Sequence, residues 1–191
     1  MTVEEAICRR RSIREFENRS VDKAELLRLV ELARLYACGG NRQPLRFGIL
    51  TNPQKTEKLF QHLHWAMYLP EYMILPQNRP PAYIILLRDE KVCKNCGYEI
   101  GAASTSIFLA AEERGLNTCA LGSFKVGFLR ELMEIPPCLC PELVIAIGYG
   151  AQQSCIVPYV DTMKYRQEEK GTFCVPKLSL TEVLAFADGD S

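Results

Sequence analysis

Residues 9–16 read Arg-Arg-Arg-Ser-Ile-Arg-Glu-Phe and are the sharpest local feature of this 191-residue chain. Four guanidinium groups and a hydroxyl within six positions form a good anion site, because arginine offers paired N–H donors to a phosphate or a carbonyl edge. A solvated basic turn or a nucleic-acid patch would share this composition. With 23 basic and 23 acidic residues the net charge is zero, which argues against nucleic acid and against an acidic membrane surface.

A second polar stretch, residues 38–44, reads Cys-Gly-Gly-Asn-Arg-Gln-Pro. Adjacent glycines allow a backbone to approach a ligand closely, and the Asn and Gln amides can donate and accept along a heteroaromatic edge. A helix-to-strand turn without a ligand would have the same sequence. Taken alone, the stretch favours that second interpretation.

Apolar patterning predicts a mixed helix and sheet protein. Residues 82–87 form a continuous apolar run between Pro81 and Arg88, which is typical of a strand buried on both faces. Asp22 and Glu25 form a helix-opening pair, and Gly115 is placed to end an alanine-rich helix. The predicted helices span residues 22–37, 53–65, 99–114 and 126–133, and the predicted strands span 46–50, 82–87, 118–121 and 143–147.

We find no repeat and no linker, so we expect one α+β domain over residues 1–191. The tail after Ser154 has weak periodicity until residues 180–184. An arm of about 35 residues without its own core is uncommon in a compact domain. It must pack on something, and a partner subunit is a natural candidate.

The N-terminus lacks a basic stretch followed by an apolar one, and no segment is long and apolar enough to span a bilayer, so we expect a cytoplasmic protein. The nine cysteines are an odd number, which indicates free thiols in an unexported chain. Cys93 and Cys96 have metal-ligand spacing, but a zinc site needs a second ligand pair. We therefore expect no metal site.

Together the two polar stretches resemble the flavin-dependent nitroreductase family, through R-R-S-x-R-x-F followed by a helix and G-G-N-x-Q-P. The resemblance continues through Gly101 in the alanine-rich helix, through residues 115–124 and Ile135-Pro136, and through residues 146–149. It ends at Val175-Pro176-Lys177 and so covers nearly the whole chain. An ordered set of motifs is far more specific than any one of them.

The resemblance implies a central, mostly antiparallel sheet flanked by helices, and a homodimer with two FMN sites at the subunit interface. The first stretch would hold FMN, the glycine-asparagine turn would reach it partly from the second subunit, the loop after residue 120 would line the isoalloxazine, and a C-terminal lysine would pair with the phosphate. The implied FMN-binding residues are Arg10, Arg11, Ser12, Arg14, Gly39, Asn41, Gln43, Leu121, Gly122, Ser123 and Lys177.

The sequence departs from the family pattern at four positions. Cys38 replaces a small hydroxyl residue, Leu45 stands where an aromatic is common, and Gly150 replaces a frequent proline. Leu178 follows Lys177 where an arginine often stands, which removes one possible phosphate partner.

The resemblance implies ping-pong hydride transfer from NAD(P)H, a diffusing reductant, through flavin to a small nitroaromatic or quinone acceptor. No protein nucleophile or general acid is needed, and we assign no catalytic residue. The alternatives are a specialised flavoprotein on the same fold (a reductive dehalogenase or a flavin-fragmenting enzyme) and a low-turnover flavin-binding redox sensor.

Two further segments need interpretation. Gly148-Tyr149-Gly150 follows an apolar strand, but Gln153 stands where a dinucleotide fingerprint has its third glycine and Pro158 follows too soon for a helix. The aromatic-rich segment 62–73 could roof the flavin and shape a substrate pocket, or could pack on its own core or on the partner.

Overall fold

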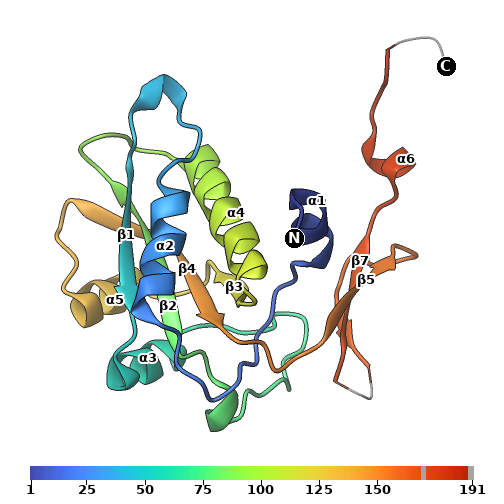
Figure 1. Ribbon diagram of the computed structural model, residues 1–191, viewed down its shortest axis with the longest axis horizontal. Coiled ribbons are helices and arrows are strands. Elements are labelled where there is room, and N and C mark those ends of the chain that lie inside the picture. The colour runs from blue at the N-terminus through green and yellow to red at the C-terminus, as the bar shows by residue number, and fades with distance from the viewer. Residues whose placement is uncertain (169–170, 189–191) are drawn as a thin grey trace.

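The computed structural model describes residues 1–168 and 171–188 (Figure 1). Its centre is a four-stranded sheet in the order β1-β2-β4-β3, in which every neighbouring pair is antiparallel. The strands are β1 (Leu45–Leu50), β2 (Ala82–Asp89), β3 (Asn117–Leu121) and β4 (Leu139–Gly148). The predicted α+β class, the central antiparallel sheet and all four predicted strands are confirmed, although β4 begins four residues earlier than its apolar run.

Helices cover both faces of this sheet. On one face, α2 (Lys23–Ala33) and α4 (Gly97–Glu113) pack against Ile84 and Leu86 of β2. On the other face, α3 (Pro53–Phe60) and α5 (Val126–Met133) pack against a second core that includes Tyr83 and Ile85. Because successive side chains of a strand point to opposite faces, the apolar run of β2 is buried on both sides, as its sequence predicts.

Local capping explains most helix boundaries. The Asp22 side chain accepts a hydrogen bond from the backbone N–H of Ala24 at the start of α2, and Gly115 takes a positive φ of 69° just after α4. A first helix, α1 (Val3–Arg9), opens with a Thr2–Glu5 capping box that the sequence reasoning missed.

Two predicted helices are shorter than expected. The helix predicted over 22–37 ends at Ala33. The helix predicted to run to residue 65 ends at Phe60, because the chain then pairs with another segment: Leu63 bridges to Phe124, and the His64 backbone N–H donates to the Ser123 carbonyl at 3.4 Å.

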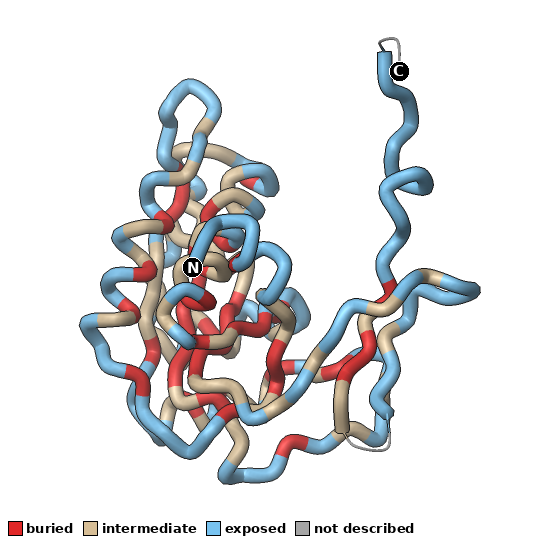
Figure 2. Tube along the Cα trace, turned by 45° about the vertical axis from the view of Figure 1, so that its right-hand side comes forward, coloured by how far each residue is buried: buried red, intermediate tan, exposed pale blue. Residues whose placement is uncertain are grey.

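The C-terminal arm holds a second sheet that the sequence reasoning did not predict. Strands β5 (Ser154–Pro158) and β7 (Phe173–Lys177) are parallel, and β6 (Arg166–Gln167) pairs antiparallel with β7. Beyond β7 the chain runs away from the rest of the molecule through α6 (Leu180–Val183) (Figure 1). This end is exposed along its described length (Figure 2), with Leu180 74% and Phe186 86% accessible.

Two glycines, Gly148 at the end of β4 and Gly150 just after it, have a structural role. A Cβ at Gly148 would lie 2.8 Å from side-chain atoms of both Phe16 and Pro81. The backbone N–H of Gly150 donates to the Asn117 side chain at 3.0 Å. Close packing therefore accounts for both glycines.

Within residues 1–168 and 171–188 no helix is long and apolar enough to cross a membrane. No three or more His, Cys, Asp or Glu side chains gather there as metal ligands would.

Candidate functional site

The basic stretch of residues 9–16 lies along the edge of the central sheet. Ser12 forms a parallel bridge with Thr118 of β3, and the Ile13 backbone N–H donates to the Thr118 carbonyl at 2.9 Å. Phe16 bridges to Gly150 on the other side. In such an extended segment neighbouring side chains point in opposite directions, so Ser12 and Arg14 face one way and Arg11 and Ile13 the other.

Arg14 is a buried guanidinium, with 9% of the residue exposed. It lies over the rings of Tyr165 and Phe173, at 4.7 and 4.8 Å from their centroids. Its one recorded side-chain hydrogen bond goes to the Ser12 carbonyl at 3.3 Å. Across residues 1–168 and 171–188 no carboxylate lies within ion-pairing distance of it. Buried charges normally have a partner, so Arg14 marks a place for an electron-rich group.

A hydrogen-bond network holds the backbone around Arg14. Its N–H donates to the Gln152 side chain at 3.0 Å, and the Gln152 amide donates to the Tyr72 hydroxyl at 2.8 Å. Tyr72 in turn donates to the Glu15 carboxylate at 2.7 Å. Burial, followed by this hydrogen bond to Glu15, raises the pKa of Tyr72 well above its ordinary value. The phenol therefore keeps its proton and stays a hydrogen-bond donor.

Tyr72 also lines a cleft of about 580 Å³. Ser123, from the loop after β3, also lines the cleft, and its other lining residues are Leu63, His64, Trp65, Ala66, Met67 and Pro70. Gly122 beside it is open, since an added Cβ would meet nothing within 4 Å. The aromatic segment 62–73, for which two interpretations were open, thus lines a cleft next to the predicted residues Leu121, Gly122 and Ser123.

The glycine-asparagine turn lies elsewhere in the same chain. Gly39, Asn41 and Gln43 are exposed, and the latter two have positive φ values of 50°. The turn is tied to the first turn of α4, where the Cys38 thiol donates to Glu99 at 3.6 Å.

The basic stretch and the glycine-asparagine turn both contact α4, and the positions of these contacts show how far apart the two motifs lie. Arg9, at the start of the basic stretch, pairs at 3.4 Å with Glu112 in the last turn of that helix. At 1.5 Å per residue, Glu99 and Glu112 are separated by about 20 Å along the axis. The two predicted motifs of one chain therefore lie at opposite ends of α4.

The remaining predicted residues have three different surroundings. The Arg10 guanidinium is 5.8 Å from the Phe108 ring centroid on α4. Lys177 is exposed at the outer end of β7. Arg11 lines a different cavity, with Asn117 and Ser154, and burial lowers its pKa. The structure thus brings Ser12 to β3, which the loop with Gly122 and Ser123 follows, and links the backbone of Arg14 through Gln152 and Tyr72 to the cleft that Ser123 lines. The Arg11 side chain and the turn at 39–43 lie elsewhere.

Sequence reasoning missed the residues that hold Arg14. Glu15 adjoins the basic motif and Tyr72 belongs to the aromatic segment, so both had a local signal. Gln152, Tyr165 and Phe173 come from the C-terminal part of the chain and had none, because only the folded chain brings them to Arg14.

The central antiparallel sheet with helices on both faces defines an α+β protein, and the buried Arg14 and the cleft lined by Trp65 and Tyr72 define its candidate ligand site. The sequence profile of the nitroreductase family matches residues 7–73. A protein of Methanothermobacter thermautotrophicus named "Putative NADH dehydrogenase/NAD(P)H nitroreductase" is 29% identical over 160 residues, which cover 80% of this chain and 79% of that protein.

Solved structures show the same fold. A nitroreductase family protein of Clostridium difficile 630 superposes with a TM-score of 0.70 at 20% identity, covering 98% of this chain and 99% of that one. A Desulfovibrio desulfuricans structure in complex with FMN gives 0.70 at 22% identity, covering 100% and 99%. The chain is thus similar in sequence to the nitroreductase family over residues 7–73, and its fold matches nitroreductase family structures over nearly its whole length.

Proposed function

We propose that residues 1–191 form one FMN-binding domain of a homodimeric oxidoreductase that uses NAD(P)H to reduce a small nitroaromatic or quinone acceptor. The observation that carries the proposal is the buried Arg14 guanidinium, which has no carboxylate partner among the described residues and lies beside a cleft of about 580 Å³. The relative named as an NAD(P)H nitroreductase and the FMN-bound relative support it.

The residues around Arg14 fit FMN. Arg14 and Ser12 would face the isoalloxazine, and the open backbone of Leu121, Gly122 and Ser123 would lie along its edge. Because Arg14 is buried, where the dielectric constant is low, its guanidinium would interact more strongly with negative charge on the isoalloxazine ring than an exposed one would.

The phosphate end of FMN needs cations of its own. Arg10 and Lys177 would hold it, because neither has an ion-pair partner within the described residues. Arg11 would meet the flavin through its backbone, since its side chain lies in another cavity.

Gly39, Asn41 and Gln43 would complete the site of a second chain. The contact of their turn with Glu99 lies about 20 Å along the axis of α4 from the contact of the basic stretch with Glu112, so the two motifs of one chain are poorly placed to share one flavin. Two copies related by a twofold axis would bring each turn to the other's basic stretch.

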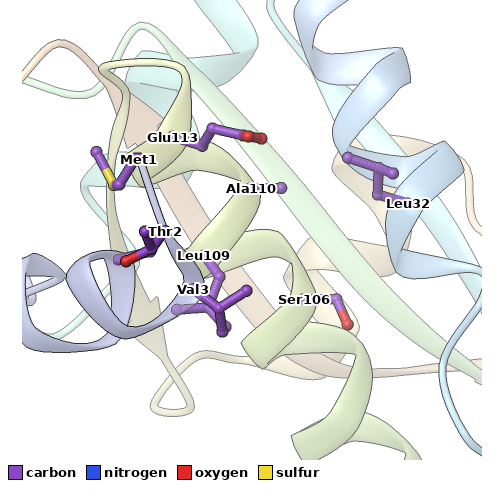
Figure 3. A pocket seen from close by; sticks show the side chains of 9 residues that line it. Met1, Thr2, Val3, Leu32, Ser106, Leu109, Ala110 and Glu113 are labelled. Atoms are coloured by element: carbon purple, nitrogen blue, oxygen red, sulfur yellow. The ribbon is translucent and has the colours of Figure 1, made fainter.

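Exposed apolar surfaces support the pairing of two chains. A groove of about 310 Å³ lies between α1, α2 and α4, with Val3, Leu32 and Leu109 on its walls (Figure 3). The exposed arm carries Leu180 and Phe186 away from its own chain. An arm and a groove that do not meet within one subunit can meet between two, and their burial would remove apolar surface from water.

When bound, FMN supplies acceptance and donation of hydride. The residues of the protein would bind and orient the flavin and the acceptor. Trp65, Met67 and Tyr72 offer a largely apolar wall against which a flat acceptor would stack. The Tyr72 hydroxyl holds its proton in the network with Glu15 and Gln152, which fixes the ring at the mouth of the cleft.

Cofactor binding and turnover test the proposal directly. The protein should take up FMN rather than FAD, seen as quenching of flavin fluorescence, and should then oxidise NADH or NADPH with nitroaromatic and quinone acceptors. A chain that binds no FMN, or binds it without turnover of any acceptor, would contradict the proposal.

Sharing of the site is tested by mixing two inactive variants. Arg14→Met and Asn41→Gly would each damage both sites of a homodimer; the glycine keeps the positive φ of residue 41. In a mixed dimer one site carries both changes and the other carries neither. Random mixing should therefore restore about one quarter of the wild-type activity. No gain on mixing would place the whole site in one chain.

A further inference from the structure

Two thiols face each other in the C-terminal sheet. Cys155 of β5 and Cys174 of β7 are register partners, and their sulfur atoms are 3.6 Å apart. Neighbouring strands are about 4.8 Å apart, which lies within the Cα separation that a disulfide spans. The pair could therefore be joined without a change of strand register.

The two thiols have different environments. Cys155 is exposed, whereas Cys174 is buried and donates its S–H to Glu168 at 3.1 Å. This hydrogen bond to a carboxylate, followed by burial, raises the pKa of Cys174 to about 12. An external reagent therefore reacts first with the Cys155 thiol. Cys174 is placed to react second, with the Glu168 carboxylate beside it as proton acceptor.

Cys155 opens onto a cationic cavity of about 320 Å³. Arg9 and Arg11 line it, and no acidic residue does. Within residues 1–168 and 171–188, the Nε of Arg11 and the hydroxyl of Ser154 are buried without a hydrogen-bond partner. The terminal nitrogens of Arg11 donate to the carbonyls of Cys8 and Arg10. Unpartnered buried donors beside a cation indicate a ligand that carries an anionic oxygen.

We propose that this cavity is a thiol–disulfide exchange site for a low-molecular-weight disulfide that carries carboxylates. The Cys155 thiolate attacks one sulfur of the disulfide, forms a mixed disulfide and releases the first thiolate. Cys174 then passes its proton to Glu168, attacks the Cys155 sulfur and releases the second thiolate. The protein pair is oxidised by two electrons and the disulfide is reduced to two thiolates, which take up protons from Glu168 and from water. The proposal does not depend on bound flavin.

Other cysteines provide internal comparisons. Cys8 is exposed and lies near Arg11, but no thiol of the described residues is hydrogen-bonded to it. Cys96 is buried, and burial raises its pKa to about 12. Neither combines an exposed thiol, a resolving thiol and a cationic cavity.

The experiment uses the reduced full-length protein with two probes, glutathione disulfide and the uncharged 2-hydroxyethyl disulfide. After an acid quench and alkylation, peptide mapping should find one disulfide, between Cys155 and Cys174. Cys174→Ser, whose hydroxyl can still donate to Glu168, should instead accumulate a glutathione adduct on Cys155. Cys8→Ser should react like wild type.

Arg11→Gln tests the cationic cavity. It should slow the reaction with glutathione disulfide about tenfold and leave the reaction with the uncharged disulfide nearly unchanged. Labelling that begins at Cys8 or Cys93, a Cys155 that remains unmodified, or equal slowing of both probes would each overturn the proposal. The wild-type peptide map needs no variant, so poor folding of a variant cannot leave the proposal undecided.

Discussion

Replacing Arg14 by Met should weaken FMN binding without weakening the fold. The flexible methionine side chain can fill the space between Tyr165 and Phe173 and carries no charge. Arg14 is 9% exposed and its recorded side-chain hydrogen bond goes to a carbonyl, so its charge is poorly compensated in the protein without ligand. Burying a charge in this way is costly, and removing it relieves that cost.

In the apo protein, the loss of the cation–π contacts and the relief of the buried charge change the free energy of unfolding in opposite directions. In the complex, the contact between Arg14 and FMN is lost as well. Two cation–π contacts contribute about 1 kcal/mol each, and relief of the buried charge offsets them. The free energy of unfolding of the apo protein should therefore change by less than about 1 kcal/mol. In the complex, a charge-assisted contact is worth about 1.5–3 kcal/mol, so the Kd for FMN should rise about tenfold to a hundredfold.

Arg19→Met is the matched control. Arg19 also lies over an aromatic ring, 3.7 Å from the centroid of Tyr149, but it is exposed and does not line the cleft. Urea unfolding and flavin fluorescence titration of both variants separate the two effects. An unchanged FMN Kd for Arg14→Met, or a loss of several kcal/mol in its apo stability, would refute the assignment of Arg14 to the flavin.

Three further outcomes are expected. Lys177→Ala should weaken FMN about tenfold to a hundredfold but leave riboflavin, which lacks the phosphate, unaffected in a fluorescence titration; equal loss for both would remove Lys177 from the phosphate site. Gly148→Ala should lower the free energy of unfolding in urea by about 1–3 kcal/mol, because the added methyl would lie 2.8 Å from two core side chains, whereas Gly127→Ala, which meets nothing within 4 Å, should not. The Cys93→Ser/Cys96→Ser double variant should keep wild-type turnover, and elemental analysis of wild type should find no stoichiometric zinc.

The central sheet could be predicted from the sequence because its strands are short apolar runs between clear breakers. Pro81 precedes β2, and Gly115 separates α4 from β3. The second sheet could not be predicted in this way. Its strands are short and mostly exposed, and β5 pairs in parallel with β7 only after a long connection. Pairing between distant segments leaves little trace in local periodicity.

The candidate site, like the two sheets, has features that the sequence predicted and features that only the folded chain shows. Residue chemistry marked the basic stretch and the glycine-asparagine turn as ligand-binding elements. Their separation along α4 depends on which helix end each one meets, through Glu99 and Glu112. That information exists only in the folded chain. The sequence therefore indicated the parts of a flavin site but not that one chain holds them about 20 Å apart.

In the basic stretch, the position of each arginine along the extended chain decides which site its side chain enters, and the number of arginines does not. Its arginines resemble one anion site in the sequence, yet the isolated bridge of Ser12 to Thr118 places the extended segment along β3 at the edge of the sheet. Alternation then directs Arg14 toward the aromatic cleft and Arg11 toward the cavity at Cys155. β7 follows the same rule, since Phe173 packs on Arg14 while its neighbour Cys174 contacts Cys155. Two adjacent segments with a period of two thus build two chemically distinct sites back to back, and a substitution on one face should leave the other largely intact.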